Sequence, residues 1–309
     1  MRKHKPQTNP LSLNDTGNHI RPSSNETSDQ LRQLYPHKPK ANETVAVAVS
    51  GGVDSMVTTL LLKEDEHEVL ALHMILRPED SPEPGEHVVQ LAARLSVPLH
   101  VVDLRRPFHQ QVIKPFLEAY RRGQTPNPCV ICNPNIKFTL LQEQAVELGA
   151  TTLATGHYVR LLRDESDGSL RLFRGRDRSK DQSYFLYRLD QAQLARTFFP
   201  LGNYLKSEVR KVAEDAGMQG YYRPESQEIC FISDKDYRTF LEQHLGSDLP
   251  GPGPVVDLNG RQLGEHEGIH RYTIGQRRGL GIPSSAPYYV IGLEPDTNTI
   301  RVGRESDLR

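Results

Sequence analysis

The feature that most constrains this chain is a regular alternation of strand-like and helix-like segments between residues 44 and 216. The strand-like segments are short β-branched or aliphatic runs, and the others carry apolar residues at helical spacing. The predicted strands are Thr44–Val49, Val69–Ile75, Leu99–Leu104 and Thr152–Thr155. The predicted helices are Asp54–Lys63, Glu86–Leu95, Phe108–Tyr120, Ile136–Leu148 and Lys206–Ala216. This pattern predicts an α/β fold with a doubly wound parallel sheet and helices on both faces.

The chain of 309 residues is long enough for about two domains. Residues 1–43 are rich in Asn, Ser, Thr and Pro and have little apolar periodicity, which predicts a disordered tail. A transit peptide is the alternative for this tail, and its acidic residues Asp15, Glu26 and Asp29 count against it. Residues 44–217 form the predicted α/β domain.

The alternation ends after Gly217, where short apolar runs are separated by Gly and Pro. Asn259-Gly260 stands between two such runs and predicts a hairpin. We therefore expect a small, mainly β central domain over residues 218–270 and a further β region over 271–309.

Charge and composition exclude several classes of protein. The formal net charge is −1, so there is no global basic field, although a local basic groove for nucleic acid stays possible. No apolar run reaches the ~18 residues of a membrane span, and the polar N-terminus does not resemble a secretory signal. Three cysteines are too few for a disulfide scaffold. These features predict a cytoplasmic enzyme that does not bind membranes.

A glycine-rich loop follows the first predicted strand and precedes the first predicted helix. Its sequence is Ser50-Gly51-Gly52-Val53-Asp54-Ser55. In α/β folds such a loop binds phosphates, because glycines let backbone N–H groups approach an anion and the helix N-terminus adds positive charge. Asp54 could hold a magnesium ion carried by the phosphates. Neither Gly-x-Gly-x-x-Gly nor a Walker sequence is present, so the loop belongs to another class of nucleotide site.

The three cysteines allow several interpretations. Cys129 and Cys132 form a Cys-x-x-Cys in a Pro- and Asn-rich segment that we expect to be a loop, and Cys230 lies far along the chain. A zinc site is disfavoured because only three thiols exist and no suitable His pair is near them. Four interpretations are still possible: a redox pair, sulfur-carrying thiols, an iron–sulfur cluster with one open iron position, and buried inert thiols.

Several motifs together resemble one family. Ser50–Ser55 resembles the PP-loop of the ATP pyrophosphatases, also called adenine nucleotide α-hydrolase-like enzymes. The further motifs resemble the tRNA-specific 2-thiouridylases over about residues 44–309. They are Gly123–Asn133, Ile136–Phe138, Ala154–Tyr158, Lys180–Leu186, Phe199–Gly202, Lys206–Arg210, Glu225–Ile232 and Tyr272–Gly279.

The resemblance implies an ATP-dependent tRNA-uridine 2-sulfurtransferase. ATP would adenylate the C2 oxygen of the wobble uridine at position 34, and a cysteine persulfide would then deliver sulfur to C2. The implied partners are ATP with Mg²⁺, a tRNA with a wobble uridine, and a sulfur donor (a sulfur-relay protein, a cysteine desulfurase or free sulfide). By resemblance, Cys230 carries the persulfide and Cys132 is the thiol that resolves it.

The same resemblance implies two sets of binding residues. The implied ATP contacts are Ala48, Val49, Ser50, Gly51, Gly52, Val53, Asp54, Ser55, Met74 and Gly156. The implied tRNA contacts are Asn127, Pro128, Cys129, His157, Lys180, Asp181 and Gln182, of which the first three face the target base. Such a base must be flipped out to be read.

The chain departs from the family pattern in two places. Cys129 stands where many relatives have a catalytic Asp, and a thiol with a pKa near 8.5 cannot replace a carboxylate at neutral pH. A mechanism with a [4Fe-4S] cluster on Cys129, Cys132 and Cys230 is therefore the alternative. The chain also stops near the start of the family's C-terminal barrel, so residues 271–309 are expected to be a truncated barrel. Weaker binding of tRNA, or dependence on a partner, is the expected result.

Two other functions compete with thiolation. One is another PP-loop adenylating synthetase, such as an amide-forming enzyme, which would need no cysteine. The other is a non-catalytic RNA-binding relative, which would have no reason to keep both the loop and the thiols.

Overall fold

The computed structural model describes residues 38–40, 42–77, 80–81, 83–223, 229–232 and 236–308. Most of the tail predicted to be disordered, and residues 225–228 of the motif Glu225–Ile232, lie outside the described residues. The chain divides into two compact units, each discontinuous in sequence. Unit 1 contains residues 1–108 and 129–226, and unit 2 contains 109–128 and 227–309.

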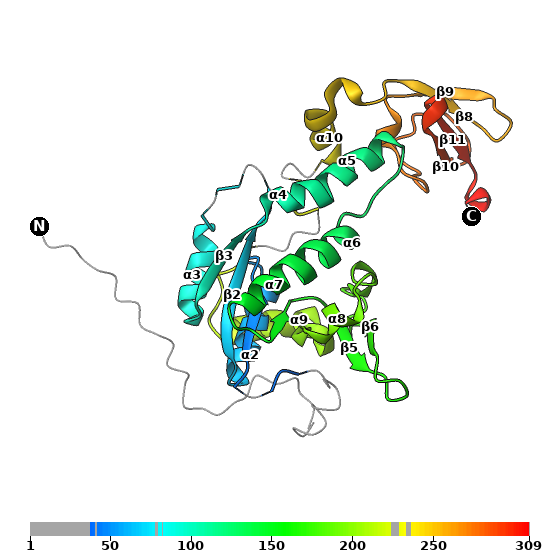
Figure 1. Cartoon of the computed structure of the whole chain (residues 1–309). Coiled ribbons are helices and arrows are strands. Elements are labelled where there is room, and N and C mark those ends of the chain that lie inside the picture. The colour runs from blue at the N-terminus through cyan, green and yellow to red at the C-terminus, as the bar shows by residue number, and fades with distance from the viewer. Residues whose placement is uncertain are drawn as a thin grey trace, which may run out of the picture. The chain divides into compact units, whose positions relative to one another are not determined.

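Unit 1 is built on a five-stranded sheet in the order β3-β2-β1-β4-β7. Strands β2 and β3 of this sheet are labelled in Figure 1. Every neighbouring pair in it is parallel. The strands are β1 (Thr44–Ala48), β2 (Glu68–Ile75), β3 (Leu99–Asp103), β4 (Thr152–Ala154) and β7 (Thr197–Phe198). The predicted α/β fold with a parallel sheet is confirmed. The short strand β7 was not predicted.

Helices α2 (Val53–Glu64), α3 (Glu86–Leu95) and α9 (Lys206–Asp215) cover the sheet of unit 1. Their apolar residues share one core cluster with Val45 and Val47 of β1. The spacing of Val88, Leu91 and Leu95 in α3 places all three on the buried side of the helix. All three helices agree with the sequence prediction to within one residue at each end.

A second helical run packs on β4 outside that cluster. It consists of α6 (Cys129–Cys132), a wide π-helical segment η2 (Asn133–Leu141) and α7 (Gln142–Glu147). The prediction started this helix at Ile136 and placed the Cys-x-x-Cys in a loop, which is wrong. Pro134 has no N–H to donate, and the wide turns of η2 accommodate it.

A two-stranded hairpin extends unit 1 beyond the sheet. Strands β5 (Val159–Arg163) and β6 (Leu170–Arg174) pair antiparallel, and the short helices η3 (Ser183–Phe185), α8 (Gln191–Ala195) and η4 (Pro200–Asn203) follow them. None of these elements was predicted.

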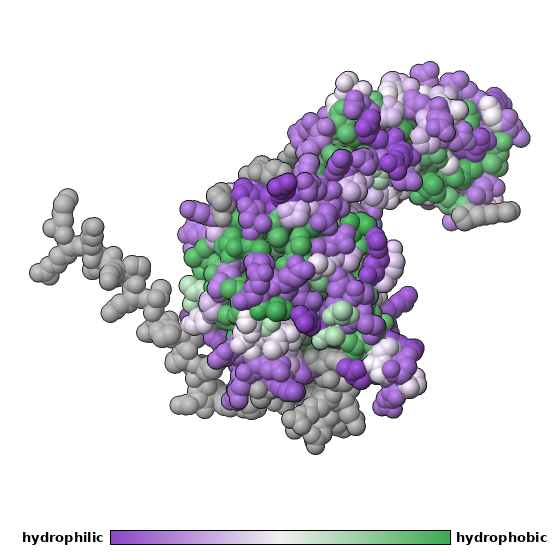
Figure 2. All heavy atoms as spheres, viewed as in Figure 1, coloured by the Kyte–Doolittle hydropathy of each residue, from purple (hydrophilic) through white to green (hydrophobic). Residues whose placement is uncertain are grey.

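Hydrophilic residues dominate much of the visible surface, with hydrophobic atoms between them (Figure 2).

Unit 2 begins inside a helical run. The elements α4 (Arg105–Phe108), η1 (His109–Ile113, π-helical) and α5 (Lys114–Arg121) follow one another, and the unit boundary lies after Phe108. Phe116 of α5 packs against Phe231 and against Phe240 of α10 (Tyr237–Leu245), with ring centroids 5.2 Å and 6.2 Å apart. The helix α10 was not expected in a mainly β region.

The rest of unit 2 is a four-stranded sheet in the order β10-β11-β8-β9. Its strands are β8 (Gly253–Val256), β9 (Gln262–His266), β10 (Tyr289–Glu294) and β11 (Thr299–Gly303). The segments 218–270 and 271–309 thus both contribute strands to one sheet. The predicted hairpin at Asn259-Gly260 is confirmed as the turn between β8 and β9, with Gly260 at φ +79°. No helix within the described ranges is long and apolar enough to cross a membrane.

Candidate functional site

The glycine-rich loop lies between β1 and α2, at the carboxyl end of the parallel sheet, where ligands bind in folds of this kind. Its conformation is held by its own serines. The Ser55 hydroxyl donates to the Gly52 carbonyl at 3.0 Å and accepts from the Ser50 N–H at 3.3 Å. Gly51 has φ +79°, a left-handed conformation that favours glycine. The loop is therefore shaped before any ligand arrives.

Two further predicted nucleotide contacts lie next to this loop or at the same sheet edge. A Cβ atom on Gly156 would come within 2.9 Å of the Asp54 backbone carbon, so the chain after β4 approaches the first turn of α2 closely. Met74 lies near the carboxyl end of β2, and β2 is joined to the start of the loop by the bond from the Val49 N–H to the Leu72 carbonyl. The structure thus gathers these predicted residues at one edge of the sheet.

Asp54 is held by two side chains from distant parts of the sequence. Both of its carboxylate oxygens lie 2.8 Å from Nζ of Lys206, and the Tyr158 hydroxyl donates to Oδ1 at 2.7 Å. The Lys206 side chain is only 6% exposed, whereas that of Asp54 is 30% exposed. A carboxylate that already accepts from an ammonium group and a hydroxyl is a poor primary ligand for magnesium. In this structure the Asp54 carboxylate is paired with Lys206 instead.

Cys129 and Cys132 lie on the single helical turn α6, and both are partly exposed. Burial raises the pKa of the Cys129 thiol, and nearby Lys137 opposes that rise. Cys129 therefore stays a thiol at neutral pH. The turn that carries the exposed Tyr184, η3, contacts α6.

His157 lies close to the same helical run. Its Nδ1 is 2.8 Å from the Thr155 hydroxyl, and its ring lies 6.1 Å from the ring of Phe138. Burial and then the positive charge of Lys137 hold the pKa of His157 well below its ordinary value. His157 is therefore a neutral imidazole at physiological pH.

The predicted tRNA-contact segment 180–182 is tied to the hairpin. The Asp181 carboxylate accepts from the Gly175 N–H at 3.0 Å and from the Ser183 hydroxyl at 2.9 Å. The Gln182 side chain accepts from the Tyr158 N–H at 3.1 Å. Asp181 and Gln182 thus shape the segment, and they fix its position relative to Tyr158.

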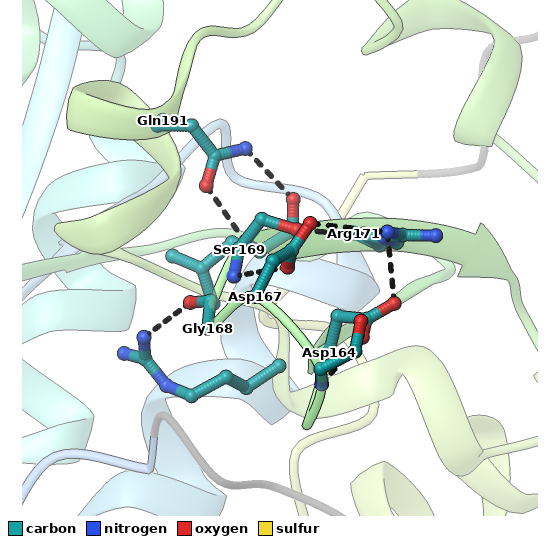
Figure 3. A network of polar contacts seen from close by, with 9 residues as sticks. Asp164, Asp167, Gly168, Ser169, Arg171 and Gln191 are labelled. Atoms are coloured by element: carbon teal, nitrogen blue, oxygen red, sulfur yellow. Dashed lines mark hydrogen bonds and ion pairs between the residues drawn. The ribbon is translucent and has the colours of Figure 1, made fainter.

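The turn of the hairpin is closed by a polar network (Figure 3). Arg171 pairs with Asp164 at 2.9 Å and with Asp167 at 3.3 Å, so the acidic residues of the turn meet a cation within the hairpin. The Gln191 side chain bonds the Leu170 N–H and carbonyl, which joins β6 to the start of α8. This network holds the hairpin that leads out of the Thr155–Tyr158 segment.

The remaining predicted site residues belong to unit 2. Asn127 is exposed and Pro128 is buried, and the unit boundary falls directly after Pro128. Cys230 is exposed and precedes the buried Phe231. Cys230 therefore belongs to unit 2, whereas the Cys-x-x-Cys belongs to unit 1.

Sequence reasoning missed three residues in this region. Lys137, Tyr158 and Lys206 were each part of a quoted motif but received no role. Lys137 acts electrostatically on both Cys129 and His157, and the other two hold Asp54. Their roles depend on contacts with residues that are distant in the sequence, so no local pattern indicated them.

Comparison with known proteins gives consistent matches along the chain. The family model described as a tRNA methyl transferase HUP domain matches residues 43–234, and the tRNA methyl transferase PRC-barrel domain matches residues 238–304. The tRNA-specific 2-thiouridylase MnmA of Carboxydothermus hydrogenoformans is 45% identical over 276 residues, which is 85% of this chain and 75% of that protein.

Two further relatives carry the same name. The protein of Geobacter metallireducens is 46% identical over 87% of this chain and 76% of its own length. That of Heliobacterium modesticaldum is 44% identical over 86% of this chain and 72% of its own length. These matches do not support the iron–sulfur alternative. Among the described residues, no group of three or more His, Cys, Asp or Glu side chains is arranged to hold a metal ion.

Proposed function

The chain belongs to the tRNA-specific 2-thiouridylase family, and from that membership we propose how its residues divide the reaction. The protein is a tRNA-uridine 2-sulfurtransferase that uses ATP to form 2-thiouridine in tRNA. The observation that carries this function is an identity of about 45% to named 2-thiouridylases over 85% of the chain.

In the first half-reaction the loop Ser50–Ser55 binds the phosphates of ATP. Its backbone N–H groups and the N-terminus of α2 stabilise negative charge on the α-phosphate as it is attacked. The C2 oxygen of the wobble uridine forms a bond to the α-phosphorus, and the bond to the leaving pyrophosphate breaks. The nucleobase of ATP lies toward Met74 and Gly156. Magnesium bound to the phosphates would neutralise part of their charge, and Asp54, which is paired with Lys206, would not be its primary ligand.

In the second half-reaction sulfur replaces the adenylated oxygen. The outer sulfur of a persulfide on Cys230 attacks C2, and AMP leaves with the former C2 oxygen. The thiolate of Cys132 then attacks the inner sulfur, which forms a disulfide and releases 2-thiouridine. A thiol reductant restores both cysteines.

The exposure of Cys230 supports delivery of sulfur by a protein that carries a persulfide. Inorganic sulfide cannot convert a thiol to a persulfide without an oxidant, whereas a cysteine desulfurase or a sulfur-relay protein transfers sulfur at the required oxidation level. The donor we propose is therefore a protein persulfide.

Cys129 does not act as the general acid or base in this scheme. The burial that raises its pKa keeps it protonated, and the nearby His157 is neutral. By resemblance to the family, Asn127, Pro128 and Cys129 are the residues proposed to face the target base. Lys180 contacts the phosphate backbone of the tRNA, and Asp181 and Gln182 hold that lysine's segment in place.

The test uses the full chain with ATP, magnesium, a tRNA transcript with uridine at position 34, cysteine and a cysteine desulfurase. Mass spectrometry of the digested tRNA measures 2-thiouridine, and a separate assay measures pyrophosphate. We expect Cys132→Ser and Cys230→Ser to abolish 2-thiouridine and to retain tRNA-dependent pyrophosphate release in the first turnover. Formation of 2-thiouridine by both variants at the wild-type rate would overturn the assigned roles.

A further inference from the structure

Three cation-capable side chains gather at the glycine-rich loop, and none of them belongs to the predicted nucleotide contacts. His73 lies near the carboxyl end of β2, with its Nδ1 2.9 Å from the Val49 carbonyl oxygen. Arg223 runs beside the loop, because its backbone N–H donates to the Gly51 carbonyl at 2.9 Å. The third side chain is His87, in the first turn of α3. All three belong to unit 1.

The imidazole of His87 lies directly against the loop. A Cβ atom added to Gly51 would come within 2.3 Å of its Nε2 and 2.4 Å of its Cδ2. A Cβ atom added to Gly85 would come within 2.9 Å of its Nδ1 and 3.3 Å of an Arg223 guanidinium nitrogen. The histidine and the arginine therefore approach the same stretch of backbone from two elements that are far apart in the sequence.

Nε2 of His87 is buried and has no hydrogen-bond partner within the described part of the chain. A buried polar nitrogen without a partner is costly, so its position against a phosphate-binding loop points to a ligand that completes it. Among the described groups, those that act on His87 electrostatically are Arg223 and His73, both able to carry positive charge. On its own helix the neighbouring Glu86 accepts from Gln90.

We propose that His73, His87 and Arg223 form a polyphosphate subsite, which receives the β- and γ-phosphates of ATP and holds the pyrophosphate that the reaction releases. This inference rests on the proposed binding of ATP by Ser50–Ser55, and it adds residues that neither the motifs nor the comparisons assign. The loop N–H groups bind the phosphate at the reacting end, and the cluster neutralises the charge at the other end.

Electrostatics supports an anionic ligand with multiple charges. Burial, the charge of Arg223 and then that of His73 lower the pKa of His87 in the absence of a ligand. A bound polyphosphate reverses that balance, because it favours the protonated imidazole. Binding of pyrophosphate therefore takes up a proton, and its affinity rises as the pH falls toward the range in which histidine protonates.

The test is calorimetric titration of the full chain, without tRNA, with inorganic pyrophosphate at about pH 8 and about pH 6. We expect His87→Gln to weaken binding about tenfold at the lower pH and to remove the extra affinity gained on acidification. Pyrophosphate itself also titrates in this pH range. The pH dependence that remains in the His87→Gln variant measures that contribution. The control variant His100→Gln changes a histidine of β3 in the same unit and should bind like the wild type.

A second variant guards against an effect of misfolding. Arg223→Gln removes an exposed guanidinium and keeps the backbone N–H that bonds Gly51, so we expect the unfolding midpoint to stay unchanged and pyrophosphate binding to weaken several-fold. Binding by both variants within twofold of the wild type at both pH values would overturn the subsite alone. A wild-type chain that binds neither ATP nor pyrophosphate would overturn the proposed nucleotide loop as well.

Discussion

Lys206 and Asp54 form a two-point ion pair, with both carboxylate oxygens 2.8 Å from Nζ, and it joins the first residue of α9 to the first turn of α2. Asp54 stands two residues after Gly52, so a residue encoded 152 positions later is bonded to the start of the helix that follows the loop. Tyr158 adds a hydroxyl to the same carboxylate and its ring lies 5.7 Å from Nζ.

Replacement of Lys206 by Met should destabilise the protein by about 2 kcal/mol. The full cost of removing one partner of a buried pair is about 3–5 kcal/mol, and the partial exposure of Asp54 reduces it. Urea unfolding measures the change, and Lys211→Met on the exposed side of α9 is the matched control. In the Lys206→Met/Asp54→Asn double variant part of the stability should return, because no carboxylate is left without a cation. Equal stability of Lys206→Met and Lys211→Met would refute this account of the pair.

Replacement of Gly51 by Ala should cost more than backbone strain alone. A left-handed conformation costs a non-glycine residue about 1–2 kcal/mol, and at position 51 the added methyl group also meets the His87 ring at 2.3 Å. Gly149 is a matched control, since its φ is +87° and no atom lies within 4 Å of an added Cβ. We expect a larger loss of unfolding free energy for Gly51→Ala than for Gly149→Ala, and partial recovery when His87→Ala is added. Equal losses at the two glycines would contradict the contact with His87.

Replacement of Lys137 by Met should raise the pKa of two groups at once. The lysine's charge lowers the pKa of His157 and that of the Cys129 thiol, so its removal raises both. An NMR titration of His157 measures the first change, and the rate of alkylation of Cys129 at fixed pH, followed by peptide mass spectrometry, should fall. Lys211→Met should change neither quantity. An unchanged His157 titration would mean that Lys137 does not act on this imidazole.

Stability should decrease as the pH falls below about 6.5, the ordinary pKa of histidine. Burial is the largest cause of a lowered pKa in five histidines: His67, His87, His157, His266 and His270. At these sites the unfolded chain binds protons at a higher pH than the folded chain does, so acid favours unfolding until the folded pKa values are passed. Urea unfolding at about pH 7.5 and about pH 5.5 measures the effect. A chain that is as stable at the lower pH would contradict it.

The parallel sheet was predictable because its determinants are local. The β-branched run at Thr44–Ala48 and the helical spacing in Glu86–Leu95 each specify one element within a few residues, and alternation then specifies the class of fold. The hairpin Val159–Arg174 was missed although Asp167-Gly168 at its turn is a recognised signal, and Gly168 has φ +72°.

The site was predictable only in part, because its geometry comes from distant segments. The glycine loop was recognised from consecutive residues. The pairing of Asp54 with Lys206 depends on how α9 packs, and the approach of His87 to Gly51 depends on how α3 packs. No local pattern encodes these contacts. The helical conformation of Cys129–Cys132 was missed because Pro and Asn suggested a loop, whereas the wide turns of Asn133–Leu141 let the helix continue past Pro134.

The discontinuous make-up of unit 2 has a consequence during translation. Phe116 of α5 is synthesised 115 residues before its ring partner Phe231 and 124 before Phe240, counted from their positions in the chain. At ribosomal rates of about 5–20 residues per second, this apolar side chain waits on the order of ten seconds for its neighbours. A nascent chain that stalls within that interval exposes the apolar side of a helix whose packing partners are not yet synthesised. Such a chain is a substrate for a chaperone that binds close to the ribosomal exit tunnel.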